Sequence, residues 1–323
     1  MEEILVSLPF MKRGLYMKEI FDFLNYVIPI RRNTRTKVKF LTYLNNEFKE
    51  QGLQCKMWKE KNGMLTMYNL VVGNLATADN IILVGYDTPT KVLVNNYLYY
   101  PLDANKNKTN EKKNIFLRSA LLILIIIGCF VGAYYISRIN IKYKLILTVL
   151  LAITCLICAL SIKETPNGNN LNKNTAAVAI IMKLLYDAEV DKSKFAVVFL
   201  DRTTDGYFGY RKIKEVMGED LNRKNVLILE CLAYGTHNYL VTNCDKSVIK
   251  ERLKRKNTFI IKTLRKRDDY SSVVSIFNKA FYFFCADELD GELVVKNTRS
   301  KNDKYYMLEN MERIGEALKS CFN

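Results

Sequence analysis

Two apolar runs joined by a short charged loop constrain this chain more than any other feature. Residues 115–136 read IFLRSALLILIIIGCFVGAYYI with a single charge, Arg118, and residues 145–162 read LILTVLLAITCLICALSI with none. A run of about 20 apolar residues matches the thickness of the hydrocarbon core of a bilayer. A pair of buried core helices is the alternative, but such helices usually keep a polar face. The pattern therefore predicts a two-helix transmembrane hairpin.

The sequence on both sides of this hairpin has the character of a soluble domain. At 323 residues the chain is long enough to bury a sizeable core. We expect one α/β domain in two parts, residues 1–113 and 164–323, interrupted by the hairpin at residues 114–163. Because a hairpin returns the chain to the side it left, both parts are expected on the same side of the membrane.

The side of the membrane is predicted from the N-terminus and the flanking charges. Residues 1–10 lack the basic segment and apolar core of a signal peptide, so we expect the globular domain in the cytoplasm. Basic residues before the first apolar run favour the same orientation, although the loop between the runs is also basic. The prediction is an integral, two-pass membrane protein with a cytoplasmic domain.

The chain has a formal net charge of +16. Such a charge could serve nucleic acid or an anionic membrane surface. The basic residues are scattered, however, and the abundance of Asn, Ile, Tyr and Lys is typical of AT-rich coding sequence, so we expect no nucleic-acid partner. The eight cysteines show no spacing typical of zinc sites or of a disulfide framework, and they are expected to be reduced.

Periodicity predicts alternating helices and strands outside the hairpin. Helical spacing marks residues 15–31, 36–51, 175–188 and 308–320, and strand-like runs occupy residues 65–72, 80–84, 91–95, 195–200, 225–230, 239–242, 258–261, 281–286 and 292–296. Continuous apolar strands between helices indicate a mixed, mostly parallel central sheet with helices on both faces. The predicted fold class is α/β.

The loops after those strands resemble motifs of the co-catalytic zinc aminopeptidases, a family that includes bacterial leucyl aminopeptidases and glutamate carboxypeptidase. The family's His-x-Asp-Thr strand end resembles residues 81–88, IILVGYDT, and its Gly-x-x-Asp-Asn-x-Ser-Gly loop resembles residues 168–176, GNNLNKNTA. Its Phe-Phe-Asp-x-Glu-Glu-x-Gly-x-x-Gly motif resembles residues 199–209, FLDRTTDGYFG. Its Leu-Asp-Cys-Val-Gly-x-Gly and His-Thr-x-x-Asp motifs resemble residues 229–235, LECLAYG, and residues 299–303, RSKND. The order of these motifs implies the fold of that family outside the hairpin.

The residues that would bind two zinc ions depart from the family's pattern. By this resemblance the ligand positions hold Gly85, Leu171, Thr204, Glu230 and Arg299, and the general-base position holds Thr203. Asp87 matches the Asp that orients a ligand His. The only histidine of the chain, His237, matches no ligand position.

These departures predict the loss of zinc and of metallopeptidase chemistry. Zinc needs His nitrogens and carboxylate oxygens at bonding distance, and of the ligand positions only Glu230 keeps such a donor. The hydroxyl of Thr203 is too weakly basic to deprotonate water near neutral pH. We expect Arg299 to replace the lost cation through an ion pair with Asp87 and Glu230, because a guanidinium suits carboxylates.

Other polar residues offer weaker candidates. Cys231 and His237 share a loop and could form a nucleophile and base, but a buried Cys and a loop His are the simpler interpretation. Asp201 and Asp205 bracket a loop at a strand end, where carboxylates can act as acid and base, although the family pattern already accounts for Asp201. The basic segments 250–256 and 265–267 could contact anionic lipid headgroups or lie on a solvated surface.

The sequence thus predicts a membrane-anchored, zinc-aminopeptidase-like protein without metal ligands or general base. We interpret it as a non-catalytic binding or scaffolding protein, a role for which the transferrin receptor is a precedent in that family. Its expected partners are the lipid bilayer and a protein or peptide that the sequence does not identify. The alternative is a divergent peptidase or hydrolase acting through unconventional residues. A third possibility, lipid-surface attachment as the main role, would require basic residues clustered beside the hairpin.

Overall fold

Short and almost fully apolar strands form the centre of the sheet. Strand β3 (Asn80–Gly85) pairs in parallel with β5 (Phe195–Leu200) on one side and with β6 (Asn225–Leu229) on the other. Nearly every residue of these strands is buried, which is typical of parallel strands that helices cover on both faces.

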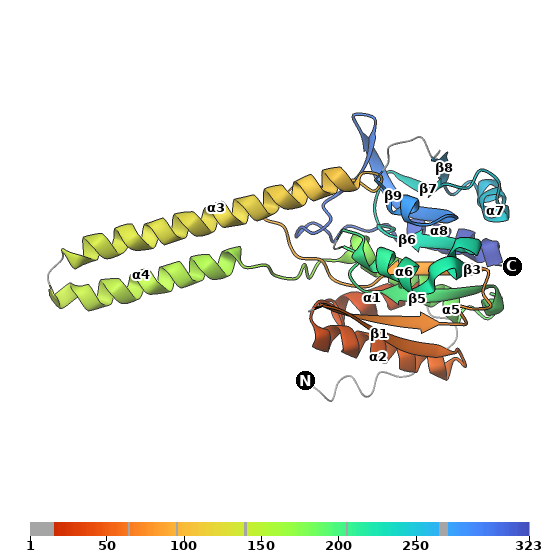
Figure 1. Ribbon diagram of the computed structural model, residues 1–323, viewed down its shortest axis with the longest axis horizontal. Helices are drawn as coiled ribbons and strands as arrows, with labels where there is room; N and C mark the ends of the chain where they lie inside the picture. Colours follow the sequence, from red (N-terminus) through yellow and green to blue (C-terminus); the bar gives the residue numbers. More distant parts are fainter. Residues whose placement is uncertain are drawn as a thin grey trace.

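The computed structural model describes residues 16–63, 65–94, 96–138, 141–204, 206–264 and 271–322. These residues form a ten-stranded sheet in the order β1-β2-β5-β3-β6-β9-β10-β4, and β7 and β8 extend from β9 (Figure 1). The remaining strands are β1 (Cys55–Asn62), β2 (Leu65–Val72), β4 (Leu98–Tyr99), β7 (His237–Thr242), β8 (Ile260–Thr263), β9 (Ala280–Leu289) and β10 (Glu292–Lys296).

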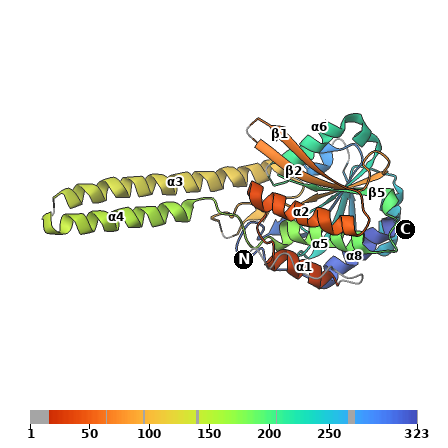
Figure 2. The ribbon, with the colours of Figure 1, turned by 90° about the horizontal axis from the view of Figure 1, so that it is seen from below.

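Helices cover both faces of this sheet (Figure 2). One face contacts α1 (Met17–Tyr26), α2 (Thr34–Glu50), α5 (Ala176–Tyr186), α7 (Val248–Lys256) and α8 (Leu308–Phe322). The other face is covered by α6 (Phe208–Arg223), by the short helix η4 (Val273–Ile276) and by loops. Because strand side chains alternate, Ile82 and Val84 join the first core and Ile81 and Leu83 join the second.

Two long helices extend from this α/β body as a hairpin (Figure 1). They are α3 (Ala104–Ser137) and α4 (Ile141–Ile162), and both are long and apolar enough to cross a membrane. No residue of the apolar stretch Tyr143–Leu160 is buried inside the protein. Cys129 and Cys155 form a disulfide between the two helices, so the expectation of reduced cysteines is wrong for this pair, whereas the other six cysteines are free. Antiparallel packing brings together cysteines whose spacing in the sequence gave no such indication.

The base of the hairpin belongs to the α/β body. Helix α3 begins well before residue 114, the predicted boundary. The Asn114 side chain accepts a hydrogen bond from the backbone N–H of Leu93 at 3.0 Å, and the buried Arg118 donates to the backbone oxygens of Lys91, at 2.6 Å, and Ile162. The contacts of Arg118 therefore join both ends of the hairpin to the loop after β3.

The predicted fold class is confirmed: the structure has a mixed, mostly parallel sheet flanked by helices. The strand predicted at residues 91–95 is wrong for its described part, because the backbone of Lys91, Val92 and Leu93 bonds to three different segments instead of to one strand. Strand β1 was not predicted, since its sequence CKMWKEKN is that of a charged edge strand.

Candidate functional site

The carboxyl ends of β3, β5 and β6 meet at one edge of the sheet because these strands are parallel. In open α/β sheets, ligands bind outside such strand ends. Two further loops approach this edge. The π-helix η2 (Leu171–Thr175) is joined to β6 by a hydrogen bond from Cys231 N to Lys173 O at 3.1 Å. It is joined to the loop before α8 by one from Leu171 N to Asp303 O, also at 3.1 Å.

The space of a side chain at position 85 is already occupied. A Cβ built on Gly85 would lie 2.3 Å from Oγ1 of Thr203, which is closer than any real contact. The Thr203 hydroxyl donates to Asp87 at 2.9 Å, and the Thr204 hydroxyl donates to the other oxygen of Asp87 at 3.0 Å. Asp87 therefore binds two threonine hydroxyls at the positions that, by the resemblance, held the general base and a ligand Glu.

Glu230 is buried at the end of β6 and bonded through both of its oxygens. Its Oε1 lies 2.6 Å from Nζ of Lys173, and its Oε2 accepts hydrogen bonds from the hydroxyls of Tyr99 at 2.7 Å and Tyr282 at 2.6 Å. The Lys173 ammonium also lies 3.5 Å from the centroid of the Tyr99 ring. Burial, and then the charge of Glu230, raise the pKa of both tyrosines well above its usual range, so both remain protonated donors.

Arg299 has partners other than Asp87 and Glu230. Its Nε donates to Thr90 O at 2.9 Å, its Nη2 donates to Thr90 Oγ1 at 2.8 Å, and its Nη1 forms an ion pair with Glu111 of α3. Burial lowers the pKa of Arg299. The structure thus differs from the predicted ion pair of Asp87, Glu230 and Arg299. The cation beside Glu230 is Lys173, because the backbone bond between η2 and Cys231 holds that lysine next to the carboxylate.

Other predicted positions lie in the core. Leu171 is buried and packs in the cluster on the α5 face of the sheet. Asp201 is fully buried and pairs with Lys37 of α2 at 2.5 Å. Burial, and then the nearby Asp87, raise the pKa of Asp201, and the Lys37 ammonium opposes that rise. Asp205, its proposed catalytic companion, lies outside the described residues.

The proposed Cys231–His237 pair has no contact in the described structure. Cys231 is fully buried, and burial raises the pKa of its thiol well above the usual range, which makes it a poor nucleophile. His237 begins β7, where its ring lies 6.3 Å from that of Tyr239. Of the basic segments, residues 250–256 lie on α7, and residues 265–267 lie outside the described residues.

The donor set at the strand ends does not fit the zinc ions that the fold implies. Glu230 is the one carboxylate left at a ligand position, and an ammonium lies against its Oε1. The hydroxyl of Thr203 fills the position of a side chain at Gly85. Among the described residues, no group of three or more His, Cys, Asp or Glu side chains could hold a metal ion.

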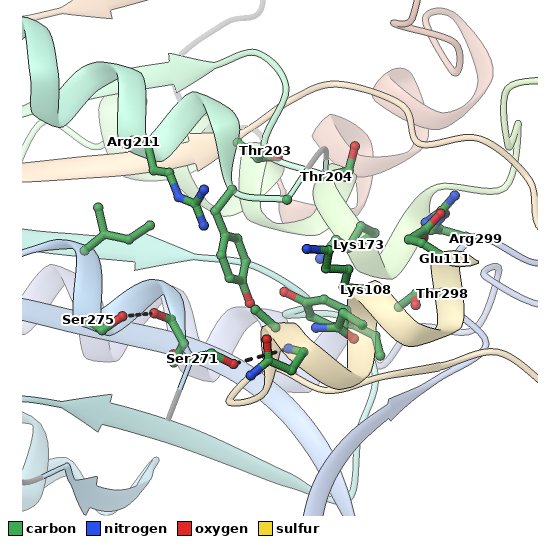
Figure 3. Close-up of a pocket in the computed structure, with 18 of the residues that line it drawn as sticks. Lys108, Glu111, Lys173, Thr203, Thr204, Arg211, Ser271, Ser275, Thr298 and Arg299 are labelled. Carbon is green, nitrogen blue, oxygen red and sulfur yellow. Dashed lines mark hydrogen bonds and ion pairs between the residues drawn. The ribbon is translucent and has the colours of Figure 1, made fainter. Parts of the chain in front are cut away.

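A cavity of about 600 Å³ opens at the same strand ends (Figure 3). Its walls come from the loop after β5, the segment before β9 that includes η4, the loop after β10, β4 and the residues before it, η2, α6 and the first turns of α3. It is lined by Tyr97, Tyr99, Ala104, Asn105, Asn107, Lys108, Glu111, Lys173, Thr203, Thr204, Gly206, Tyr207, Arg211, Ser271, Ser272, Ser275, Ile276, Thr298 and Arg299. Four of the side chains are cationic and one is a carboxylate.

Sequence reasoning missed Lys173 and the contribution of α3 to this site. Lys173 is the only charged residue between Glu164 and Lys183, and a lone lysine among amides and apolar residues was a signal for a buried ion pair. The wall formed by Ala104–Glu111 had no such signal, because those residues look like the polar flank of a membrane span.

No protein-family model and no curated protein matches this sequence. Solved structures do match. A glutaminyl cyclase from Porphyromonas gingivalis has a TM-score of 0.54 at 10% identity, covering 95% of this chain and 98% of that chain. A glutaminyl cyclase from Fimbriiglobus ruber has a TM-score of 0.52 at 13% identity, covering 95% and 92%. The LapA aminopeptidase from Legionella pneumophila has a TM-score of 0.51 at 10% identity, covering 94% and 69%.

These structural similarities indicate the fold of this chain and not its chemistry, because the sequence identities are low. They agree with the motif order found in the sequence. The protein has the zinc-aminopeptidase-like fold that glutaminyl cyclases and aminopeptidases share.

Proposed function

We propose that this protein is a membrane-anchored binding protein without peptidase activity, built on a zinc-aminopeptidase-like fold. The observation that carries the proposal is the pairing of Lys173 with Glu230 at 2.6 Å. An ammonium at that distance neutralises the one remaining ligand carboxylate and opposes the approach of a metal cation.

The second part of the proposal concerns the cavity. By the resemblance, the two threonines whose hydroxyls bind Asp87 replace the general base and a ligand Glu, yet the space outside the strand ends remains open at about 600 Å³. That volume lies in the range of small-molecule sites. A cavity retained beside groups unsuited to zinc chemistry favours binding over hydrolysis.

The third part concerns the membrane. We propose that α3 and α4 cross the bilayer as a hairpin and that the α/β body lies in the cytoplasm. Large apolar side chains such as Leu124, 62% exposed, and Phe130, 74% exposed, cover the hairpin surface and would be costly to leave in water. Lys112 and Lys113 precede the first apolar run and favour a cytoplasmic base.

The proposal is tested by metal analysis and an activity assay on the full chain in detergent. After incubation with excess zinc and dialysis, we expect no stoichiometric zinc, no hydrolysis of aminoacyl nitroanilides and a melting temperature that a chelator does not change. Zinc-dependent hydrolysis that Glu230→Gln abolishes would instead establish the alternative, a divergent hydrolase.

A further inference from the structure

The cavity at the strand ends has more positive charge than its own residues neutralise. Lys173 is paired with Glu230, and Arg299 is paired with Glu111. Lys108 of α3 and Arg211 of α6 also line the cavity, and neither has an acidic partner among the described residues. Figure 3 shows the Lys108 side chain beside Lys173 in the middle of the cavity, with Arg211 on one side of them and Thr298 on the other. Two cations are thus left for an occupant to neutralise.

A buried hydroxyl in the same wall has no hydrogen-bond partner. Thr298 is 1% exposed, lines the cavity, and its Oγ1 has no partner within the described structure. An unsatisfied buried hydroxyl costs free energy, on the order of 1–3 kcal/mol. A ligand atom in the cavity would provide the missing bond.

The rest of the wall is suited to an organic group. Tyr97, Tyr99 and Tyr207 contribute aromatic surface, and Ile276 adds an apolar side chain. Most remaining polar side chains already have partners: Ser271 bonds to Asp103, and the Ser275 hydroxyl donates to Ser272 O at 2.7 Å. The available groups are therefore two cations and the hydroxyls of Thr298 and Tyr207, beside aromatic surface.

We propose that this cavity binds a phosphate monoester, with Arg211 and Lys108 contacting the phosphate and the aromatic wall contacting its organic group. A phosphate monoester carries about −1.5 to −2 charges near pH 7, which matches the two cations, whereas a carboxylate would leave one of them without a counter-charge. The guanidinium of Arg211 suits bidentate contact with phosphate oxygens. This inference rests on the proposed binding function and names the chemistry of its ligand.

The same chemistry is found in soluble metabolites and in lipid headgroups. Lys108 lies seven residues before the apolar run that begins at Ile115, which is about 10 Å along α3. The cavity is therefore near the base of the hairpin, where the headgroup of phosphatidic acid would be within reach. The experiment described next distinguishes a soluble phosphate monoester from a lipid headgroup.

The test measures phosphate binding by the full chain. In detergent, phenyl phosphate is titrated by calorimetry, with benzoate as the carboxylate comparison. In nanodiscs of phosphatidylcholine with a minor fraction of phosphatidic acid, the ³¹P resonance of the phosphomonoester is followed, with phosphatidylglycerol as the phosphodiester comparison. Saturable binding of phenyl phosphate indicates a soluble ligand. Broadening confined to phosphatidic acid indicates a lipid headgroup, and either outcome supports the site.

Matched variants locate the site. Arg211→Gln and Lys108→Gln should each weaken binding about tenfold to a hundredfold, because each removes a charge-assisted contact. Both side chains are exposed, so the variants should fold, and their melting temperatures check this. Arg223→Gln and Lys112→Gln remove the same charges from exposed positions on the same helices, outside the cavity, and should bind normally.

Absence of binding in both the detergent and the nanodisc arms would overturn the inference. Equal losses in the control variants, or benzoate binding as tightly as phenyl phosphate, would overturn it as well. These outcomes are distinct from failure of the proposed function, which would appear as zinc-dependent hydrolysis.

Discussion

At the scale of single residues, one lysine places a positive charge at the carboxyl ends of the parallel strands. Lys173 is 3% exposed and Glu230 is 1% exposed, so their ion pair is shielded from water. A buried ion pair is stable only when the two charges are paired and the remaining carboxylate oxygen is hydrogen-bonded. Here the hydroxyls of Tyr99 and Tyr282 donate to the second oxygen of Glu230. The pair occupies the position that the resemblance gives to a metal and its ligand.

Removing one partner should therefore be costly. We expect Lys173→Met to destabilise the α/β body by about 3–5 kcal/mol, because it leaves the buried carboxylate of Glu230 without a counter-charge. The double variant Lys173→Met/Glu230→Gln should recover part of that loss, since it leaves no charge behind. Thermal denaturation in detergent measures both.

Lys194 provides the matched control for this substitution. It lies 3.7 Å from Asp191, and both side chains are nearly half exposed, so Lys194→Met should change the stability by less than about 0.5 kcal/mol. A Lys173→Met variant as stable as the wild type, or one that binds and is stabilised by zinc, would contradict this interpretation of the pair.

Asp303 is another buried carboxyl group, and its titration should be measurable. It is 2% exposed, its Oδ1 accepts a hydrogen bond from the backbone of Asn172 at 2.9 Å, and its Oδ2 has no partner among the described residues. Burial raises the pKa of Asp303 well above its ordinary value of 3.8, and the hydrogen bonds from Asn172 and Arg299 oppose that rise only in part.

Because this pKa is raised in the folded state, the native protein holds a proton that the unfolded chain has released. The stabilisation from that proton is complete below pH 4 and is lost as the pH rises toward the folded pKa. Relative to Asp303→Asn, which does not titrate, the wild type should therefore lose stability from pH 4 to pH 7, by at most about 1.4 kcal/mol per pH unit. If the melting temperatures of the two proteins change with pH in the same way between pH 4 and pH 7, the expectation is wrong.

At the scale of elements, α3 has two roles along one continuous helix. Its first turns form a wall of the cavity, and its later turns carry the apolar surface of the hairpin. Glu111, Asn114 and Arg118 lie between these parts and bond to Arg299 and to the loop after β3. The hairpin is thus joined to the body through the helix base and not only through its chain ends.

This arrangement predicts where the hairpin can be removed. A variant that lacks residues 121–160, with a short flexible linker in their place, should be folded and soluble without detergent, because it keeps Asn114 and Arg118. A variant that lacks residues 114–163 removes their hydrogen bonds and should melt at a lower temperature. Thermal denaturation compares the two, and equal stability would mean that these contacts contribute nothing.

At the scale of the whole molecule, the hairpin would set the body at a membrane surface if α3 and α4 cross a bilayer as we propose. The chain enters and leaves α3 and α4 at neighbouring points, so the two parts of the α/β body lie on one side (Figure 1). If the hairpin crosses the bilayer, its tip lies on the opposite side from every described part of the body.

Cysteine labelling tests this topology. Cysteines introduced at Tyr143, near the tip, and at Lys256, at the end of α7, are exposed to a membrane-impermeant maleimide in a background without Cys55, Cys158 and Cys244. We expect Tyr143→Cys to react in intact cells and Lys256→Cys to react only after permeabilisation. Labelling of both from the same side would exclude a two-pass hairpin, and the inverse pattern would reverse its orientation.

The sequence by itself determined the elements whose signals are local. The apolar run of β5 coincides with the observed strand, because a parallel strand covered by helices on both faces must be apolar along its length. The prediction for residues 292–296 also coincides with β10, whose three central residues are buried. The apolar parts of α3 and α4 were likewise predicted from the chain itself, although α3 begins before the predicted boundary. The motifs after the strands resemble those of the zinc aminopeptidases in the same order, and this resemblance predicted the fold.

Only the tertiary structure decided which charges meet. Lys37 reaches Asp201 across 164 positions, Lys173 and not Arg299 lies against Glu230, and Arg299 turns toward Glu111. Long cationic side chains can reach several carboxylates, and the carboxylate with which each one pairs depends on the packing of loops far apart in sequence. For the same reason the sequence located the strand ends but not the cavity, whose wall is completed by the first turns of α3.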